Sequence, residues 1–284
     1  MTPAPDIRPA TRHDLPQIAR ILAANGEPVE LPGVEGYPYL EFLLERGRMA
    51  VSVVHGRVGG FVSVVRVGDA SVVSDLFIDP ARHGHGHGSA LLAATLDEDG
   101  PRMTFSSGDP RALPVYVRAG MRPWWPNLYV QADPAALARL PADPAFVAEP
   151  ATLEATTAAA LTLTGIDRSA DFAFYAAQPD AAGFVIRDAG AVAAVAWASR
   201  DDEGAGRQVD HASIARDADA GRAALAAFRA GAAGDQVWGC VPGPHPGLPA
   251  LLGAGARIVD RDTYCTSDPG WLDPERILPN PSLL

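Results

Sequence analysis

Apolar residues near the start of the chain recur with the period of a helix that buries one face. The segment PATRHDLPQIARILAANG, residues 9–26, has four such positions in register, which are Leu15, Ile18, Ile21 and Leu22. Thr11 with Asp14 three residues later is a capping signal for the start of this helix, and Gly26 marks its end. A second, shorter apolar pattern at residues 39–44 predicts another helix.

The pattern then changes to valine-rich segments separated by turn residues. Residues 49–80 are broken at His55-Gly56 and at Gly68-Asp69, which predicts three antiparallel strands joined by tight turns, the third ending at Pro80. After a glycine-rich loop, the sequence predicts a helix through residues 91–96, a strand at 103–107, a helix at 112–118 and a strand at 128–131. These elements indicate an α+β fold in which helices flank a mixed, mainly antiparallel twisted sheet.

Segments of the first half have matches in the second half at nearly one spacing. HGRVGGFV at residues 55–62 matches AGAVAAVA at 189–196, and LPVYVRAGMRP at 113–123 matches LPALLGAGARI at 248–258, at offsets of 134 and 135 residues. Ordered matches at one offset favour an internal duplication, although chance similarity in a chain rich in Ala, Gly and Pro is the alternative. We therefore predict two tandem domains, 1–132 and 145–284, joined by a segment rich in Pro, Asp and Ala.

Composition narrows the classes of function. The 284 residues carry 23 Lys and Arg against 34 Asp and Glu, a net charge of −11, which argues against nucleic acid as a partner. The two cysteines, Cys240 and Cys265, provide no disulfide framework, so a reducing cytoplasm is the expected location. The sequence has no secretory signal pattern at its start and no apolar run long enough to cross a bilayer, so we expect no membrane partner.

Glycines alternate with histidines in FIDPARHGHGHGSALL, residues 77–92, between a predicted strand and a predicted helix. Gly84, Gly86 and Gly88 remove side-chain bulk where the first helical amides lack internal partners, so a ligand phosphate could approach them closely. A Walker-type loop would need a lysine that is absent here, and a dinucleotide fingerprint would need a glycine at Ser89 and a parallel βαβ setting. The pattern therefore indicates a different kind of phosphate cradle, with a flexible surface turn as the alternative.

The alternating histidines also raise the possibility of a metal-binding module. His83, His85 and His87 are good ligands, but a tight site needs four fixed ligands with supporting contacts, and an alternating His-Gly run offers three without rigidity. We therefore expect no metal cofactor.

The loop and its flanks resemble the Gcn5-related N-acetyltransferase (GNAT) superfamily. The family pattern is an apolar strand end, often Asp-Pro, then Arg/Gln-x-x-Gly-x-Gly/Ala and a helix start with paired leucines. Here LFIDPARHGHGHGSALL matches it except that His83 stands where Arg or Gln is usual, which leaves one side-chain contact to pyrophosphate in question. ALPVYVRAGMRP is similar to the family's second motif and places Tyr116 at its tyrosine. The resemblance covers roughly residues 6–131 and implies acetyl-CoA as the acyl donor.

The resemblance also implies which residues bind the donor. The pyrophosphate would lie on the loop amides, and the pantetheine arm would pair with the strand end as an extra strand. The expected cofactor-binding residues are Phe77, Ile78, His83, Gly84, His85, Gly86, His87, Gly88 and Ser89.

Acyl transfer to an amine requires a base for the amine and an acid for the departing thiolate. Asp75, two residues before Phe77 and on the same face of the strand, is the candidate base, acting through water. Tyr116 is the candidate general acid. The alternatives are a carboxylate satisfied by neighbouring donors and a core tyrosine with a satisfied hydroxyl. Glu27, Glu30, Glu35 and Glu41 are expected either to face a cationic acceptor or to form a solvated acidic surface.

The second half is predicted to be a degenerate, non-catalytic GNAT-like domain. In the repeat alignment Leu251 faces Tyr116, and the segment that matches the loop, RDADAGRAAL, keeps only Gly221. Asp217 and Asp219 would repel a phosphate there. We expect an N-acyltransferase acting on a small-molecule or peptide amine, as a monomer or homodimer. The alternative is an acyl-CoA-binding sensor or scaffold without turnover.

Overall fold

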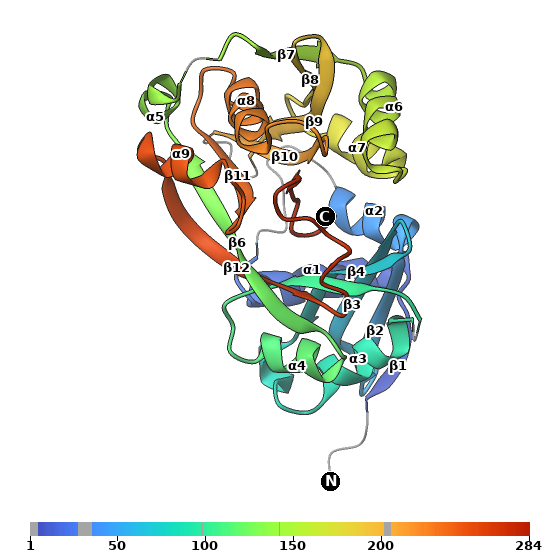
Figure 1. Cartoon of the computed structure of the whole chain (residues 1–284). Coiled ribbons are helices and arrows are strands. Elements are labelled where there is room, and N and C mark those ends of the chain that lie inside the picture. Colours follow the sequence, from blue (N-terminus) through green and yellow to red (C-terminus); the bar gives the residue numbers. More distant parts are fainter. Residues whose placement is uncertain (1–4, 28–35, 98, 142, 202–205) are drawn as a thin grey trace. The chain divides into compact units, whose positions relative to one another are not determined.

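The computed structural model describes residues 5–27, 36–97, 99–141, 143–201 and 206–284 (Figure 1). Glu30 and Glu35 lie outside the described residues. The chain forms two compact units: the first comprises Met1–Pro123 with Cys265–Pro269, and the second comprises Trp124–Tyr264 with Gly270–Leu284. In the described part of the chain, no helix has both the length and the apolar character needed to cross a membrane.

The first unit is built on five strands in the order β1-β2-β3-β4-β5. They are β1 (Asp6–Pro9), β2 (Arg48–Val54), β3 (Arg57–Val67), β4 (Ala70–Ile78) and β5 (Arg102–Ser106). The pairs from β1 to β4 are antiparallel and β4 pairs with β5 in parallel. The valine-rich meander that the sequence predicts is therefore present, and it forms the core of the sheet.

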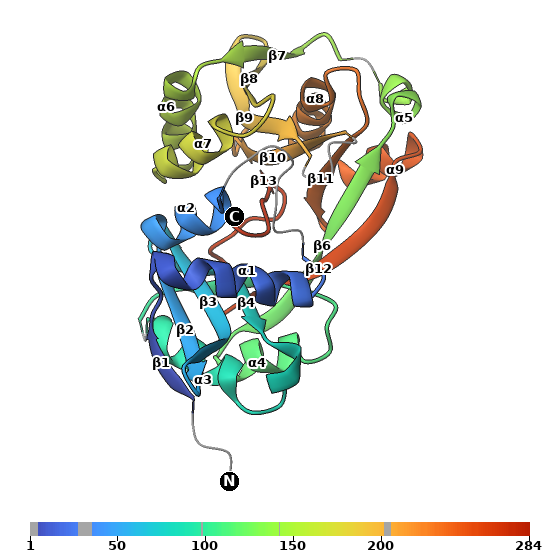
Figure 2. The same cartoon turned by 180° about the vertical axis from the view of Figure 1, so that it is seen from behind.

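Helices cover both faces of this sheet. They are α1 (Leu15–Ala24), α2 (Pro38–Arg46), α3 (His87–Thr95) and α4 (Ala112–Arg118), with short 3-10 helices η1 (Arg12–Asp14) and η2 (Pro80–Arg82). Val62 and Val64 point to one face and pack with Leu91 and Leu92 of α3. Figure 2 shows α1 lying across the sheet, in contact with β3 and β4.

The start of the first helical segment is fixed by the predicted capping residues. Thr11 donates to Asp14 Oδ2 through both its backbone amide and its hydroxyl, each at 2.9 Å. Arg8 donates to both oxygens of the same carboxylate at 2.7 and 2.8 Å. These contacts hold the pKa of Asp14 at about 2, the Arg8 hydrogen bond being the largest cause.

Two irregularities in β4 shape the site. Ser63 pairs with Asp75 while Val64 pairs with Val73, so Ser74 is an extra, bulged residue that re-aims the side chains after it. In the described structure the pairs between β4 and β5 are Ser71–Arg102 and Val72–Met103. The strands pair only near the start of β4, so no described strand covers the edge of β4 after Ser74, and this stretch is its open edge.

The second unit repeats this order of elements. Its strands are β6 (Arg122–Ala132), β7 (Phe146–Ala151), β8 (Ala182–Asp188), β9 (Ala191–Arg200), β10 (Arg207–Ile214), β11 (Val237–Pro242), β12 (Arg257–Thr266) and β13 (Ile277–Leu278). Its helices are α5 (Pro134–Arg139), α6 (Leu153–Thr164), α7 (Ser169–Ala176), α8 (Ala220–Ala232) and α9 (Leu248–Gly253). From β7 to β12 the sequence of strands and helices follows that from β1 to β6, as a duplication would produce.

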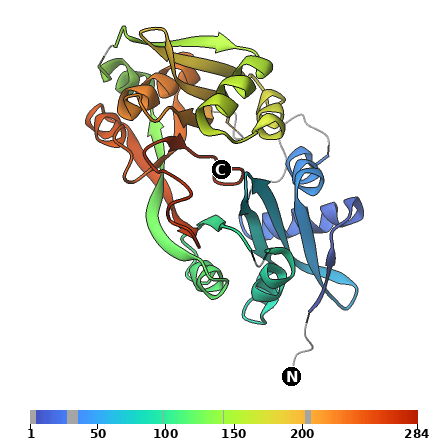
Figure 3. The ribbon, with the colours of Figure 1, turned by 45° about the vertical axis from the view of Figure 1, so that its right-hand side comes forward.

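Figure 3 shows the ribbon of the second unit, and the alternation of side chains along β9 separates the two faces of its sheet. Ala194 and Ala196 belong to the core cluster that contains the buried alanines of α8. Trp197 packs instead against Phe172 of α7, with ring centroids 6.1 Å apart. The small residues allow α8 to lie close to the sheet, where Gly231 leaves no room for a larger side chain beside Ala198.

The compact units differ from the predicted ranges 1–132 and 145–284 in where the last strand of each half lies. Strand β6, although in the first range, pairs antiparallel with β11 and belongs to the second unit. Residues 265–269, although in the second range, belong to the first unit, where Ser267 N donates to Arg102 O at 2.9 Å. This exchange has no signal in the local apolar pattern.

Candidate active site

The glycine-rich loop has the backbone conformation that its glycines permit. Gly84 and Gly86 have φ of +81° and +80°, in the left-handed region that disfavours other residues. Helix α3 begins at His87, its N-cap Gly86 supplies no side-chain cap, and Ala90 N donates to Gly86 O at 3.1 Å. The amides of residues 87–89 therefore have no partner within the helix and carry the positive end of its dipole.

A pocket of about 550 Å³ opens beside this loop. Its lining includes nine of the eleven predicted site residues, which are Phe77, Ile78, His83, Gly84, Gly86, His87, Gly88, Ser89 and Tyr116. Asp75 and His85 are not among the residues that line it. The remaining walls come from the end of α1, the segment around residues 107–111, and α4.

Three arginines that the sequence analysis did not select line the same pocket. They are Arg82, Arg111 and Arg118. Arg111 donates to Asp109 at 2.5 Å and also contacts His83 Nδ1. Arg82 lies along Gly59, where a Cβ atom would come within 2.6 Å of the Arg82 Cδ atom. Two acidic residues, Glu27 and Asp109, also line the pocket, so the arginines are in the majority there although the chain has a net charge of −11, and this local excess suits an anionic ligand.

The loop histidines face different partners. His83 Nε2 lies 3.0 Å from Ile78 O, to which Asn25 Nδ2 also donates. His83 therefore lies between the end of β4 and Arg111 and contacts both. His87 is buried, with Nδ1 3.0 Å from Ser52 Oγ, and burial lowers its pKa. The described residues include no group of three His, Cys, Asp or Glu arranged to hold a metal ion.

Asp75 is a buried carboxylate held by two hydroxyl groups. Tyr39 Oη and Ser63 Oγ each donate to its Oδ2 at 2.9 Å. Burial raises its pKa to about 6, and the two hydroxyl donors only partly oppose that effect. Tyr39 comes from α2 and was not selected from the sequence, because nothing local marks its contact with a strand 36 residues later.

Tyr116 lies on α4 and is 6% exposed. It packs in the core cluster with Leu91 and Leu92 of α3 while lining the pocket. The Tyr116 side chain is thus part of the core and also part of the pocket lining.

In the second unit, the N-terminus of the matching helix is capped by a side chain of the protein itself. Helix α8 has Asp219 as its N-cap, and the Asp219 carboxylate accepts from Arg222 N at 3.0 Å. A carboxylate therefore occupies the position that an anionic ligand would need, whereas α3 has an uncapped glycine there.

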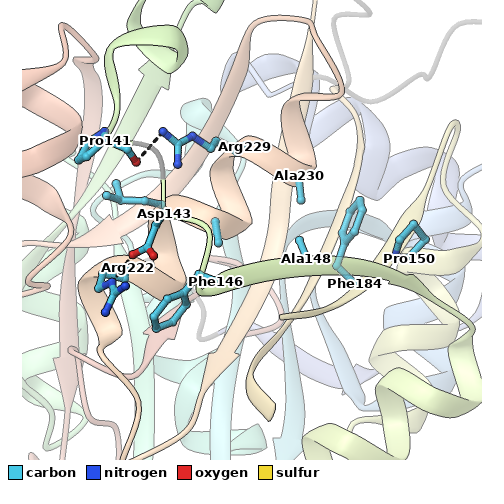
Figure 4. Close-up of a pocket in the computed structure, with 11 residues that line it drawn as sticks. Pro141, Asp143, Phe146, Ala148, Pro150, Phe184, Arg222, Arg229 and Ala230 are labelled. Carbon is cyan, nitrogen blue, oxygen red and sulfur yellow. Dashed lines mark hydrogen bonds and ion pairs between the residues drawn. The ribbon is translucent and has the colours of Figure 1, made fainter. Parts of the chain in front are cut away.

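A second pocket, of about 380 Å³, lies in the second unit between β7, β8 and α8 (Figure 4). Arg222 stacks on Phe146 with its guanidinium carbon 4.6 Å from the ring centre and pairs with Asp143. Arg229 donates to Pro141 O at 2.8 Å. Both arginines contact the chain itself, as Arg111 does in the loop pocket, but no glycine is among the described residues that line this second pocket. The loop pocket of the first unit is the stronger candidate site.

Comparison with known proteins supports the fold. No model of a protein family matches the chain, and no curated protein does either. Among solved structures, a protein from Pyrococcus horikoshii described as a candidate acetyltransferase aligns with 99% of this chain and 94% of its own, at 12% identity and a TM-score of 0.66. A GCN5-related N-acetyltransferase from Anabaena variabilis covers 93% of this chain and 72% of its own, at 15% identity and a TM-score of 0.62.

A tandem GNAT protein from the clavulanic acid biosynthesis pathway covers 95% of this chain and 100% of its own, at 17% identity and a TM-score of 0.62. The chain therefore has a tandem GNAT fold. This result confirms the predicted α+β class and the expected fold of two tandem GNAT-like domains.

Proposed function

We propose that the first unit is an N-acyltransferase that takes an acetyl or short acyl group from acyl-CoA and transfers it to an amine. The observation that carries this proposal is the N-terminus of α3, which has no side-chain cap and follows two glycines of positive φ. Its first residues line a pocket that three arginines also line. The fold shared with N-acetyltransferase structures supports the same chemistry.

The residues of the pocket fit the parts of acyl-CoA. The amides from Gly84 to Ser89 and the arginines suit its phosphates. Because Asp79 N donates to Gly59 O, the alternation of an antiparallel pair turns the main-chain groups of Leu76 and Ile78 away from β3. Ile78 O already accepts two hydrogen bonds, so the pantetheine arm would pair with Leu76 and with Ile78 N.

The proposed chemistry needs two proton transfers. Bound acyl-CoA supplies an activated thioester. Asp75, with a pKa of about 6, is ionised at neutral pH and able to accept a proton, which would reach it through Tyr39 and water since its carboxylate does not line the pocket. Tyr116 would donate a proton to the leaving sulfur. The acceptor is proposed to be a small-molecule or peptide amine.

The first test compares two glycine substitutions of equal conformational cost. Gly86 and Gly56 have φ of +80° and +73°, and a Cβ atom at either would meet no atom within 4 Å. Acetyl-CoA at 100 times its Kd should stabilise the wild type by about 2.7 kcal/mol in a thermal-shift titration. Gly56→Glu should respond as the wild type does and Gly86→Glu should not. An unresponsive wild type, or equal responses of both variants, contradicts the proposal.

A second candidate is an acyl-CoA sensor without turnover, which is favoured by the absence of Asp75 from the residues that line the pocket. A sensor needs the loop alone. Tyr116→Phe should keep its affinity for acetyl-CoA in either case, but only an enzyme should lose turnover, by on the order of 100-fold. Equal turnover of Tyr116→Phe and wild type would remove the acid role of Tyr116, and no turnover with any amine would favour the sensor.

A further inference from the structure

The last described residues of the chain pair with the sheet of the second unit. Strand β13 lies antiparallel on β10, with Leu278 opposite Ala212 and Ile277 opposite Ser213. Ile214 N also donates to Arg276 O at 2.9 Å. The parallel pairs between β10 and β11 run from Arg207–Val237 to Val209–Gly239. After these pairs, the same edge of β10 pairs with β13 instead.

This edge matches the open edge of β4 in the first unit. Each strand has a bulge against its antiparallel neighbour: Val73 and Asp75 flank that of β4, and Val209 and His211 flank that of β10. Asp75 directly follows the first bulge and His211 the second. In the first unit the edge after the bulge is not paired with β5, whereas in the second unit residues 276–278 cover it.

The two ends of this segment are held by buried or half-buried arginines. At its start, Arg276 Nη1 donates to Ala215 O at 3.1 Å and to Ala218 O at 2.7 Å. At its end, Arg168 Nη2 lies 2.5 Å from Leu284 O and 3.3 Å from Leu283 O. Arg168 is 4% exposed and its Nε lies 2.9 Å from Asp171 Oδ2.

A turn at Asn280 directs the end of the segment to Arg168. Asn280 Oδ1 accepts from Ser282 N and Leu283 N, and Leu284 N donates to Asn280 O at 2.7 Å. Leu283 and Leu284 are each 1% exposed. Two apolar side chains and two main-chain oxygens are therefore bound together.

A cluster of aromatic rings with His211, called the His211 wall, lies beside the end of this segment. Tyr175 stacks on His211, which is fully buried, and Phe172 contacts both of these rings and Trp197. The main chain of Leu284 forms a hydrogen bond that partly offsets the fall in the His211 pKa caused by burial. In the described residues, Trp197 Nε1 is buried without a hydrogen-bond partner. The Trp197 Nε1–H group is therefore able to donate to a ligand that carries an additional hydrogen-bond acceptor.

We propose that the second unit contains a binding groove for an extended apolar peptide, and that residues 276–284 of the same chain are its ligand. The groove comprises the edge of β10, which binds the peptide main chain, and Arg168 with the His211 wall, which binds its last two residues. This inference does not depend on acyl transfer by the first unit.

The test uses the whole chain, cleaved at a protease site inserted between Asp273 and Pro274, before the paired segment. Residues 274–284 should stay bound through gel filtration and exchange with a fluorescein-labelled peptide of the same sequence. Arg168→Gln should speed the exchange at least about tenfold, because the main-chain oxygens lose their donor. Arg187→Gln, which removes an exposed pair with Glu149, should not.

Two results would overturn the proposal. One is immediate loss of the cleaved peptide while tryptophan fluorescence remains that of the folded second unit. The other is equal exchange by a labelled peptide carrying Asp at 277 and 278, since Ile277 and Leu278 are 7% and 1% exposed and would bury those charges. Should the Arg168→Gln chain fail to fold, the doubly substituted peptide against the cleaved wild type decides alone.

Discussion

Replacing Asp75 by asparagine should change how the stability of the first unit depends on pH. Burial raises the pKa of this carboxyl from 3.8 to about 6, so ionisation opposes folding. A difference of about 2 units, at roughly 1.4 kcal/mol per unit, corresponds to about 3 kcal/mol. In the wild type this stability is present below about pH 4 and is lost as the pH rises through 6. Asp75→Asn has no ionisable group and should lack this loss.

The quantity to measure is the free energy of unfolding of the variant minus that of the wild type, at pH values from 4 to 8. It should rise by about 3 kcal/mol, mostly between pH 4 and 6. Any constant penalty from placing an amide among hydroxyl donors cancels in the pH-dependent part. All five tryptophans lie in the second unit, so hydrogen exchange in peptides from β3 and β4 is the appropriate probe of the first.

Ser63→Ala provides a control that keeps the carboxyl. It removes one of the two hydroxyl donors, so the pKa of Asp75 in the folded state should rise further and the upper end of the pH window should move to higher pH. A pH-independent difference between Asp75→Asn and wild type would refute the reasoning, because it would mean that Asp75 ionises as it does in water. If Asp75 is the base of acyl transfer, wild-type kcat/KM should also fall as the pH drops below about 6.

Three further predictions concern the loop and its counterpart. Gly86→Ala and Gly56→Ala should each lower the free energy of unfolding by about 1 kcal/mol because of their positive φ, but only Gly86→Ala should weaken acetyl-CoA binding in titration calorimetry. Arg111→Gln should raise the Kd for acetyl-CoA about fivefold at low salt and less at high salt, whereas Arg48→Gln, which removes a surface pair with Asp97, should leave it unchanged. Asp219→Ala removes the N-cap of α8 and should destabilise the second unit by about 1 kcal/mol, as measured by tryptophan fluorescence. Titration calorimetry should still give one acetyl-CoA per chain, because β13 covers the edge of β10. A stoichiometry of two per chain would contradict this prediction.

The sequence was informative where a feature depends on neighbouring residues. The valine alternation of β2, β3 and β4, the capping signal at Thr11 and the glycine loop before α3 are all local, and the structure has each of them. Except for His85, the predicted loop residues line one pocket with Tyr116 because a short helix and a strand return to the same edge of the sheet.

Features that depend on distant pairing were missed. Arg111 and Arg118 join the pocket from beyond β5, and Tyr39 reaches Asp75 from another helix; no periodicity marks such contacts. The bulge at Ser74 leaves the valine pattern intact, so the alternation alone places Asp75 in line with the pocket residues. The pairing of β13 with β10 joins residues about 65 positions apart, through a strand of two residues too short to produce a pattern.

The assignment of residues 265–269 to the first unit has a consequence for protein synthesis. A nascent chain that has reached Pro123 has all five strands of the first sheet, but Arg102 on β5 still lacks its partner Ser267. At ordinary rates of translation that partner follows on the order of ten seconds later. The first unit is thus completed only after the ribosome has synthesised residues 124–264 of the second unit. A gene fragment that ends after residue 132 would encode a sheet with an unpaired edge, prone to association.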